Sequence, residues 1–124
     1  MSRPKSFDEV QAAWNERDPE KIRAHLDRAL APDVVFCDPQ HHITGIDAFE
    51  KMVRDFRKEI PDARTAIVSG LDHHHDLYRY EWHVYDGDKL LVPGMDVTRI
   101  DAQGRIERID GFFGPIPLLA TSPE

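Results

Sequence analysis

The chain has 124 residues, 40% of them hydrophobic and 31% charged, a balance typical of one globular domain. Its net charge of −7 argues against a nucleic-acid partner, because binding to phosphates requires a basic surface. No apolar run approaches the roughly 20 residues of a membrane span, and residues 1–6 lack the apolar core of a secretory signal. The single cysteine, Cys37, excludes an internal disulfide. We therefore predict one cytoplasmic domain over residues 1–124, with its core at about 6–114, that binds neither nucleic acid nor membrane.

The first half of the chain predicts three helices. A capping-box pattern at Ser6–Glu9 starts the first helix, which we expect to end near residues 15–17. Asp18-Pro19 starts the second, because aspartate is a good N-cap and proline is favoured in the first helical turn. The third, at about residues 47–59, carries an apolar stripe at helical spacing and is stopped by Pro61.

The rest of the chain predicts strands. A short strand lies between the second and third helices, and four longer ones follow them, at residues 34–37, 63–69, 77–85, 90–100 and 105–113. Hairpin turns at residues 86–88 and 102–104 join the last three strands. This order indicates an α+β fold in which a curved, mostly antiparallel sheet closes on three N-terminal helices. Such a sheet leaves a conical cavity open at one end, which is a common ligand site.

Two aspartates stand beside apolar runs that suit a buried sheet. Asp96 lies between Met95 and Val97, although aspartate is depleted in strands and costly to bury unless protonated, paired or hydrogen-bonded. Asp38 ends the first strand in an Asp-Pro step, which is also a good turn start. We expect both carboxyl groups to open into one apolar cavity, with the pKa of Asp96 raised by burial.

Three motifs occur in a characteristic order, at Ala31–Pro39, Gly45–Phe49 and Asp96–Ile106. Together they resemble the nuclear transport factor 2-like superfamily, in its SnoaL-like and ketosteroid isomerase branches. The resemblance covers nearly the whole chain, from Phe7 to Phe113. It implies a cone-shaped α+β fold of the cystatin-like kind, with a curved antiparallel sheet packed on three helices.

The resemblance also implies roles for single residues. In ketosteroid isomerase an aspartate in an Asp-Pro step moves the proton, and a protonated aspartate on a late strand holds the enolate oxygen. Asp38 and Asp96 match these positions. Trp14 stands where that family has its oxyanion tyrosine, which argues against steroid isomerisation, because an indole N–H is far less acidic than a phenol. In SnoaL-type cyclases an acid lies on the final strand at the position of Asp110.

Strand alternation divides residues 78–85 into two faces, the first with Arg79, Glu81, His83 and Tyr85, the second with Tyr78, Tyr80, Trp82 and Val84. If the hairpin is centred on Asp86-Gly87, the first face shares the side of Asp96. His83 is then an acid/base candidate, or else a sheet histidine bonded to its neighbours, and the rest of that face contacts the ligand. The aromatic second face would form the outside of the sheet and a homodimer interface. Trp14, Phe56 and Phe113 are expected to line the cavity.

Histidines cluster at residues 41–42 and 73–75, which raises the question of a metal site. Consecutive histidines in a loop between strands point in different directions and lack the same-face spacing of a helical zinc motif. We therefore expect no metal and no cofactor.

The leading hypothesis is a cofactor-independent isomerase or cyclase that moves a proton next to the carbonyl group of a small apolar ligand. Asp38 or His83 would be the base, and protonated Asp96 would donate to the oxyanion. The alternative is a non-catalytic ligand-binding or dimerisation module of the same fold. A third hypothesis, epoxide hydrolysis, requires an arginine between two acids inside the cavity, and Arg79 is the candidate.

Overall fold

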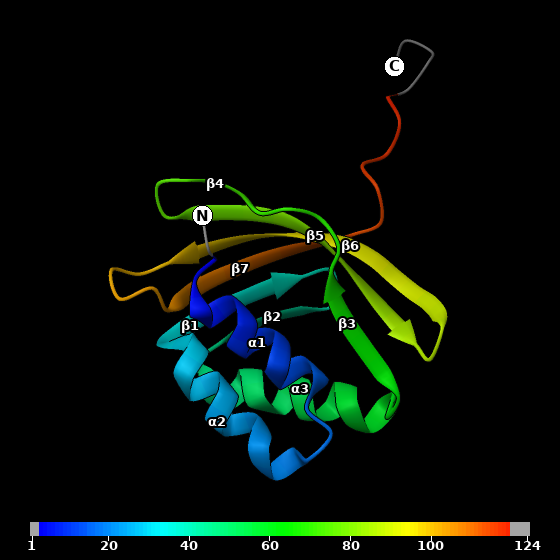
Figure 1. Ribbon diagram of the computed structural model, residues 1–124, viewed down its shortest axis with the longest axis horizontal. Helices are drawn as coiled ribbons and strands as arrows, with labels where there is room; N and C mark the ends of the chain where they lie inside the picture. Colours follow the sequence, from blue (N-terminus) through cyan, green and yellow to red (C-terminus); the bar gives the residue numbers. More distant parts are fainter. Residues whose placement is uncertain (1–2, 120–124) are drawn as a thin grey trace.

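The computed structural model describes residues 3–119. Three helices, α1 (Lys5–Asn15), α2 (Pro19–Ala29) and α3 (Ile46–Glu59), lie on one face of a seven-stranded sheet (Figure 1). The strands are β1 (Leu30–Asp38), β2 (His41–Thr44), β3 (Ala63–Ile67), β4 (Asp72–His74), β5 (Leu77–Asp86), β6 (Lys89–Ile100) and β7 (Ile106–Phe113). The predicted α+β class is confirmed. Strands β2 and β4 were not predicted, since both fall in the histidine-containing segments that we expected to be loops.

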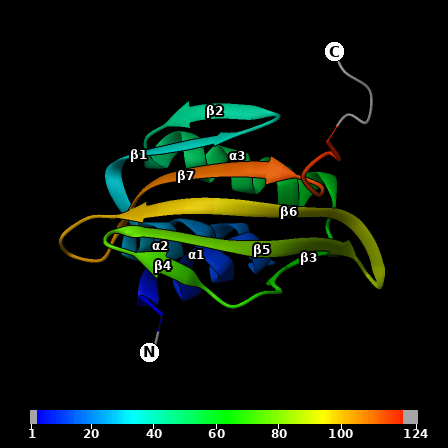
Figure 2. The ribbon, with the colours of Figure 1, turned by 90° about the horizontal axis from the view of Figure 1, so that it is seen from above.

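The strands follow the order β2-β1-β7-β6-β5-β3, and β4 pairs with the other end of β5 (Figure 2). Neighbouring strands are antiparallel except β1 and β7, which are parallel, so the sheet is mixed rather than wholly antiparallel. In this pairing Phe36 lies opposite Ile109. The first strand of the chain therefore lies next to the last, and the ends of both strands reach the same edge of the cavity.

The helix starts differ from one another in how they are capped. Asp18 accepts a hydrogen bond from the backbone N–H of Glu20 at 3.0 Å, and Pro19 is the first helical residue, as predicted. The capping box expected for α1 is not formed, and Pro4 occupies the N-cap position. Ser6 instead donates to the carbonyl of Gly104 at 2.7 Å, which fastens α1 to the turn between β6 and β7.

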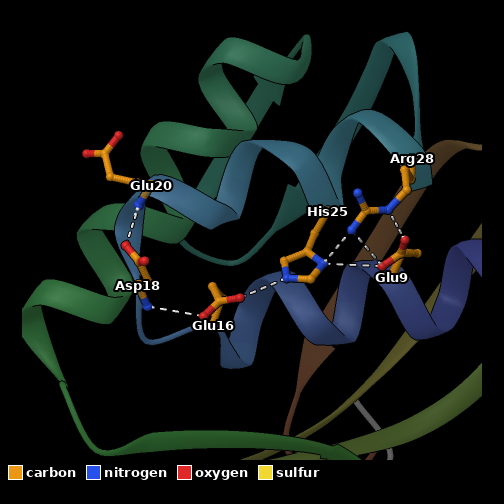
Figure 3. Close-up of polar contacts among 6 residues, drawn as sticks. All are labelled: Glu9, Glu16, Asp18, Glu20, His25 and Arg28. Atoms are coloured by element: carbon orange, nitrogen blue, oxygen red, sulfur yellow. Dashed lines mark hydrogen bonds and ion pairs between the residues drawn. The ribbon is translucent and has the colours of Figure 1, made fainter.

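A polar cluster joins α1 to α2 (Figure 3). The ring of His25 lies between two carboxylates of α1, with Nδ1 3.2 Å from Glu9 and Nε2 2.9 Å from Glu16. Arg28 pairs with Glu9 on the same side. Hydrogen bonding lowers the pKa of both carboxyl groups, chiefly from Arg28 at Glu9 and from His25 at Glu16. These contacts fix the two helices against each other on the side away from the sheet.

The hydrophobic core lies between the helices and the inner face of the sheet. Its fully buried side chains include Phe7, Ile22, Leu26, Leu30, Val34, Phe49, Val53 and Ile106. Arg57 is buried at the end of α3 and donates to the backbone carbonyls of Pro61, Ala63 and Trp14. The C-terminal end of α3 is therefore fixed against both α1 and β3, which sets one wall of the cavity described below.

The opposite face of the sheet carries no helix among residues 3–119 (Figure 2). Within the same residues, none of the helices combines the length and the apolar character that crossing a membrane requires.

Candidate functional site

A cavity of about 370 Å³ opens between α1, α3 and the inner face of the sheet. Most of its wall is apolar or aromatic, from Trp14, Phe36, Met52, Phe56, Trp82, Val84, Leu91, Val92 and Phe113. The polar side chains that reach it include Gln11, Asp38, Thr65 and Asp96. Trp14, Phe56 and Phe113 thus lie where the sequence predicted. The volume suits a small organic ligand, within the usual range of such pockets.

Asp96 lies on β6, opposite Tyr80 on β5 and Gly111 on β7. The indole N–H of Trp82 donates to its Oδ1 at 2.8 Å, and the Tyr80 hydroxyl lies 3.4 Å from its Oδ2. Burial raises the pKa of Asp96 to about 7, the charges of Asp38 and Asp110 add to the rise, and the Trp82 and Tyr80 hydrogen bonds oppose it. Near neutral pH the carboxyl group is therefore divided between its neutral and charged forms.

The hydrogen bonds around Asp96 also place its proton. An indole N–H can only donate, so Oδ1 accepts from Trp82. Oδ2 accepts a longer bond from the Tyr80 hydroxyl, which can instead turn toward Thr98 Oγ1, so the proton of the neutral acid is best placed on Oδ2. Burial raises the pKa of Tyr80 as well, which keeps its hydroxyl protonated, 3.0 Å from Thr98 Oγ1. Asp96 can therefore present an O–H donor at the wall of the cavity.

Two glycines in the middle of strands make room for this arrangement. A Cβ at Gly94 would lie 2.2 Å from the Trp82 ring and 2.6 Å from the carbonyl oxygen of Phe112. A Cβ at Gly111 would lie 2.7 Å from Asp96 Oδ1 and 3.5 Å from the Cβ of Asp38. Glycine inside a strand often marks such a close approach, and this was the available signal for the roles of Trp82 and Gly111, which the sequence analysis missed.

Asp38 lies at the end of β1 with 11% of its side chain exposed, and it lines the same cavity. Its Oδ1 accepts from the backbone N–H groups of Gln40 and His41, both at 2.8 Å, and lies 3.2 Å from the His41 ring. Asp38 therefore has both of the roles that the sequence suggested: its carboxyl group reaches the cavity, and one of its oxygens stabilises the turn. Among the described residues Oδ2 has no hydrogen-bond partner, so it is available to a ligand.

The prediction of which face of β5 points into the cavity is wrong. Tyr80 and Trp82 point inward, whereas Arg79, Glu81, His83 and Tyr85 lie on the outer face and do not line the cavity. A β-bulge is the cause: Val84 pairs with Val92 but Tyr85 pairs with Leu90, which leaves Leu91 as an extra residue and turns every preceding side chain to the other face. The aromatic dimer face that we expected on the outside of the sheet is therefore part of the inside.

The outward residues of β5 have partners of their own. Arg79 pairs with Asp72 at 2.7 Å, and His83 Nδ1 lies 2.9 Å from the hydroxyl of Tyr85. The guanidinium of Arg64 stacks on the Tyr85 ring at 4.3 Å. No arginine stands between two acids in the cavity as described, so the structural basis for epoxide hydrolysis is missing.

Asp110 also lies outside the cavity. It follows the strand alternation, with Gly111 inward and Asp110 outward, and its carboxylate accepts two hydrogen bonds from Arg108 at 2.9 and 3.1 Å. It acts on the site only through its charge, which helps raise the pKa of Asp96.

Gln11 and Thr65 form a polar pair in the cavity wall. Sequence reasoning missed Gln11, because nothing distinguishes it on the surface of a helix. Its side-chain oxygen accepts from the Thr65 hydroxyl at 2.9 Å, and its amide N–H₂ has no acceptor within residues 3–119. Residues 3–119 contain no group of three or more side chains arranged to hold a metal ion, and His73 stacks on Tyr78.

The family model of the SnoaL-like domain matches residues 7–109. The chain belongs to this family. A crystal structure from Agrobacterium tumefaciens, provisionally named an isomerase of the SnoaL-like family, is 27% identical, with a TM-score of 0.82 over 90% of this chain and 96% of that one. No curated protein sequence matches the chain.

More distant structures share the fold of this SnoaL-like domain. A nuclear transport factor 2-like protein of unknown function from Exiguobacterium is 20% identical, with a TM-score of 0.72 over 90% of this chain and 99% of that one. A provisionally named polyketide cyclase from Sinorhizobium meliloti is 17% identical, with a TM-score of 0.68 over 87% and 94%. The fold is therefore cystatin-like, as in the nuclear transport factor 2-like proteins. One fold hosts many functions, so the chemistry depends on the side chains of the cavity and not on the fold alone.

Proposed function

We propose that this SnoaL-like domain is a cofactor-independent enzyme that moves a proton next to the carbonyl group of a small apolar ligand, as in isomerisation or aldol cyclisation. The observation that carries the proposal is the pair Asp38 and Asp96, two carboxyl groups in one apolar cavity whose surroundings differ. Pairs of titratable groups in contrasting environments are typical of acid–base sites. The provisional names of two structural relatives, an isomerase and a cyclase, point the same way.

The two carboxyl groups take different roles. Asp38 Oδ2 removes the proton from the carbon next to the carbonyl, and the electrons of that C–H bond move into an enolate. The O–H of Asp96 donates to the developing oxyanion, because its other oxygen is engaged by Trp82. Asp38 then returns the proton to a second carbon in an isomerisation. In a cyclisation the enolate carbon attacks another carbonyl carbon, the C=O electrons move onto its oxygen, and Asp38 gives its proton to that alkoxide. His83 is no longer a base candidate, since it faces away from the cavity.

The second candidate is a ligand-binding domain without catalysis. It is favoured by the turn at Asp38, whose Oδ1 is used structurally by two backbone N–H groups. In that case the Asp38 carboxylate would stabilise the loop and take no part in catalysis.

Proton exchange in deuterated water separates the two candidates. A planar bicyclic ketone such as 2-tetralone would be incubated with the protein, and NMR would follow the loss of its protons next to the carbonyl. We expect Asp38→Asn to bind the ketone and lose the exchange, and Asp96→Asn to bind it and slow the exchange by about 10²–10³-fold. Asp33→Asn, at an exposed position of β1 that does not line the cavity, is the matched control and should behave as the parent. Binding without any acceleration by the parent would favour the non-catalytic module.

A further inference from the structure

The charged side chains that line the cavity are almost all acidic. Its ionisable side chains are Asp38, Asp55, Glu59, Asp96 and His41, and neither lysine nor arginine lines it within the described residues. Nearby cations are engaged elsewhere. Arg57 is bound to backbone carbonyls, Arg54 pairs with Glu50 at 2.9 Å, and Arg64 lies over Tyr85. An anionic ligand would therefore enter an acidic space that offers no fixed positive charge.

The acids lie at different depths. Asp96 lies on the inner face of the sheet, at the floor, and is only half-buried, while Asp55 and Glu59 are exposed, one turn apart on α3, at the rim. Across the rim, Leu91 and Val92 come from the β5–β6 hairpin, which bends toward the C-terminal end of α3 (Figure 1). Lys51 pairs with Asp55 at 2.6 Å, but both side chains are well exposed and such pairs are weak. Glu59 pairs with no cation in the part of the chain that the structure describes.

The wall between floor and rim is aromatic. Trp14, Phe36, Phe56, Trp82 and Phe113 line it, and their rings meet at steep angles, as in the perpendicular Trp14–Phe56 pair at 5.2 Å. Each ring carries negative potential on its face, and a cation over such a face is attracted most where water is excluded. The aromatic wall and the rim carboxylates thus both favour a positively charged ligand.

We propose that the ligand of this cavity carries a positively charged nitrogen, as a tertiary or quaternary ammonium group, on a compact apolar body. The charged end lies between the aromatic wall and the rim acids, and the uncharged end reaches Asp96. The proposal builds on the proposed function in assigning a carbonyl group to that inner end, but the charge preference requires no catalysis. Carboxylate, sulfonate and phosphate ligands are disfavoured by the same lining. The net charge of −7 would attract a cation toward the mouth from a distance.

Three para-substituted acetophenones of nearly equal size test this preference. Their substituents are trimethylammonium, tert-butyl and sulfonate, so charge changes while shape is almost constant. Isothermal titration calorimetry at low salt should show the trimethylammonium ketone binding about tenfold more tightly than its tert-butyl isostere. The sulfonate should bind more weakly than either. Equal affinities, tighter binding of the sulfonate, or binding of none of the three would overturn the proposal.

Paired variants link the preference to the rim. Glu59→Gln should reduce the advantage of the cation over its neutral isostere severalfold and leave the affinity of the neutral ketone unchanged. Glu20→Gln removes the same charge from the exposed start of α2, where the side chain points away from the polar cluster and does not line the cavity, and should change nothing (Figure 3). If the neutral ketone exchanges its protons but the cation has no advantage, only the charge preference fails. If the cation binds best without exchange, only the proposed function fails.

Discussion

Trp82 and Asp96 are joined across neighbouring strands by an indole N–H that lies 2.8 Å from one carboxyl oxygen. The register places Tyr80, not Trp82, directly opposite Asp96, so the contact is diagonal and depends on the tryptophan ring lying flat along the sheet. Gly94, opposite Trp82, permits this orientation because it has no side chain. The protonation and the direction of Asp96 therefore depend on residues that never touch a ligand through chemistry of their own.

The stability of Asp96→Asn should depend on pH differently from that of the parent. The folded-state pKa of about 7 exceeds the ordinary 3.8, so the stabilisation from proton binding is complete below about 3.8 and is lost as pH rises through 7. Asparagine cannot ionise. We expect the free energy of unfolding of the variant, relative to that of the parent, to rise by up to about 4 kcal/mol from acid to mildly alkaline pH. Urea denaturation across this range measures it, and parallel pH profiles would mean that Asp96 titrates normally.

Gly94→Ala should disturb the Trp82–Asp96 pair. The new methyl group would overlap the Trp82 ring and the Phe112 carbonyl, and overpacking of this kind costs about 1–3 kcal/mol. We expect lower stability, a shifted Trp82 indole N–H resonance and an altered Asp96 titration by NMR. Gly70→Ala is the matched control, because a Cβ there meets nothing within 4 Å and should leave both resonances in place. An unchanged indole resonance in Gly94→Ala would contradict the role given to the glycine.

Glu16→Gln should weaken the link between α1 and α2. His25 lowers the pKa of Glu16, so this stabilisation is present above the ordinary 4.5 and is lost as pH falls through the lowered folded value. We expect a loss of about 1 kcal/mol near neutral pH that disappears in acid, where the parent carboxylate is protonated too. Thermal melts at several pH values test it, with Glu20→Gln as the unpaired control. A loss that is the same at every pH would point to packing instead of charge.

The uncovered face of the sheet leads us to propose a homodimer, through residues other than those first expected. Val35, Met95 and Val97 are half-buried there, and Phe112 is 59% exposed. Apolar patches of this kind usually mark association. Phe112→Glu should yield monomers in sedimentation experiments, while Ile116→Glu, which adds the same charge on the exposed tail, should not. A parent protein that sediments as a 14.3 kDa monomer at micromolar concentration would contradict the dimer.

The sequence predicted the parts that local chemistry decides. The periodicity of α3 and the Asp18-Pro19 start of α2 follow from neighbouring residues. The place of Asp38 beside the cavity was predicted from the end of an apolar run together with the family resemblance. The face of β5 could not be read in this way. One extra residue at Leu91 reverses the inward and outward sets, and Leu90-Leu91-Val92 looks like an unbroken apolar strand. The error therefore lies in the register of the β5–β6 hairpin, which depends on the bulge at Leu91 and cannot be read from the apolar pattern of either strand.

The parallel pairing of β1 with β7 has a consequence for how the protein folds. Asp38 comes early in the chain and Asp96 late, and the floor between them is completed by Gly111 on the final strand. Pairings between such distant segments form slowly, because a long loop must close, at a cost in entropy, before any stabilising contact forms. During synthesis the helices and the β5–β6 hairpin can form while the cavity floor is still missing. A chain interrupted before β7 would carry both aspartates and have no pocket in which they could meet.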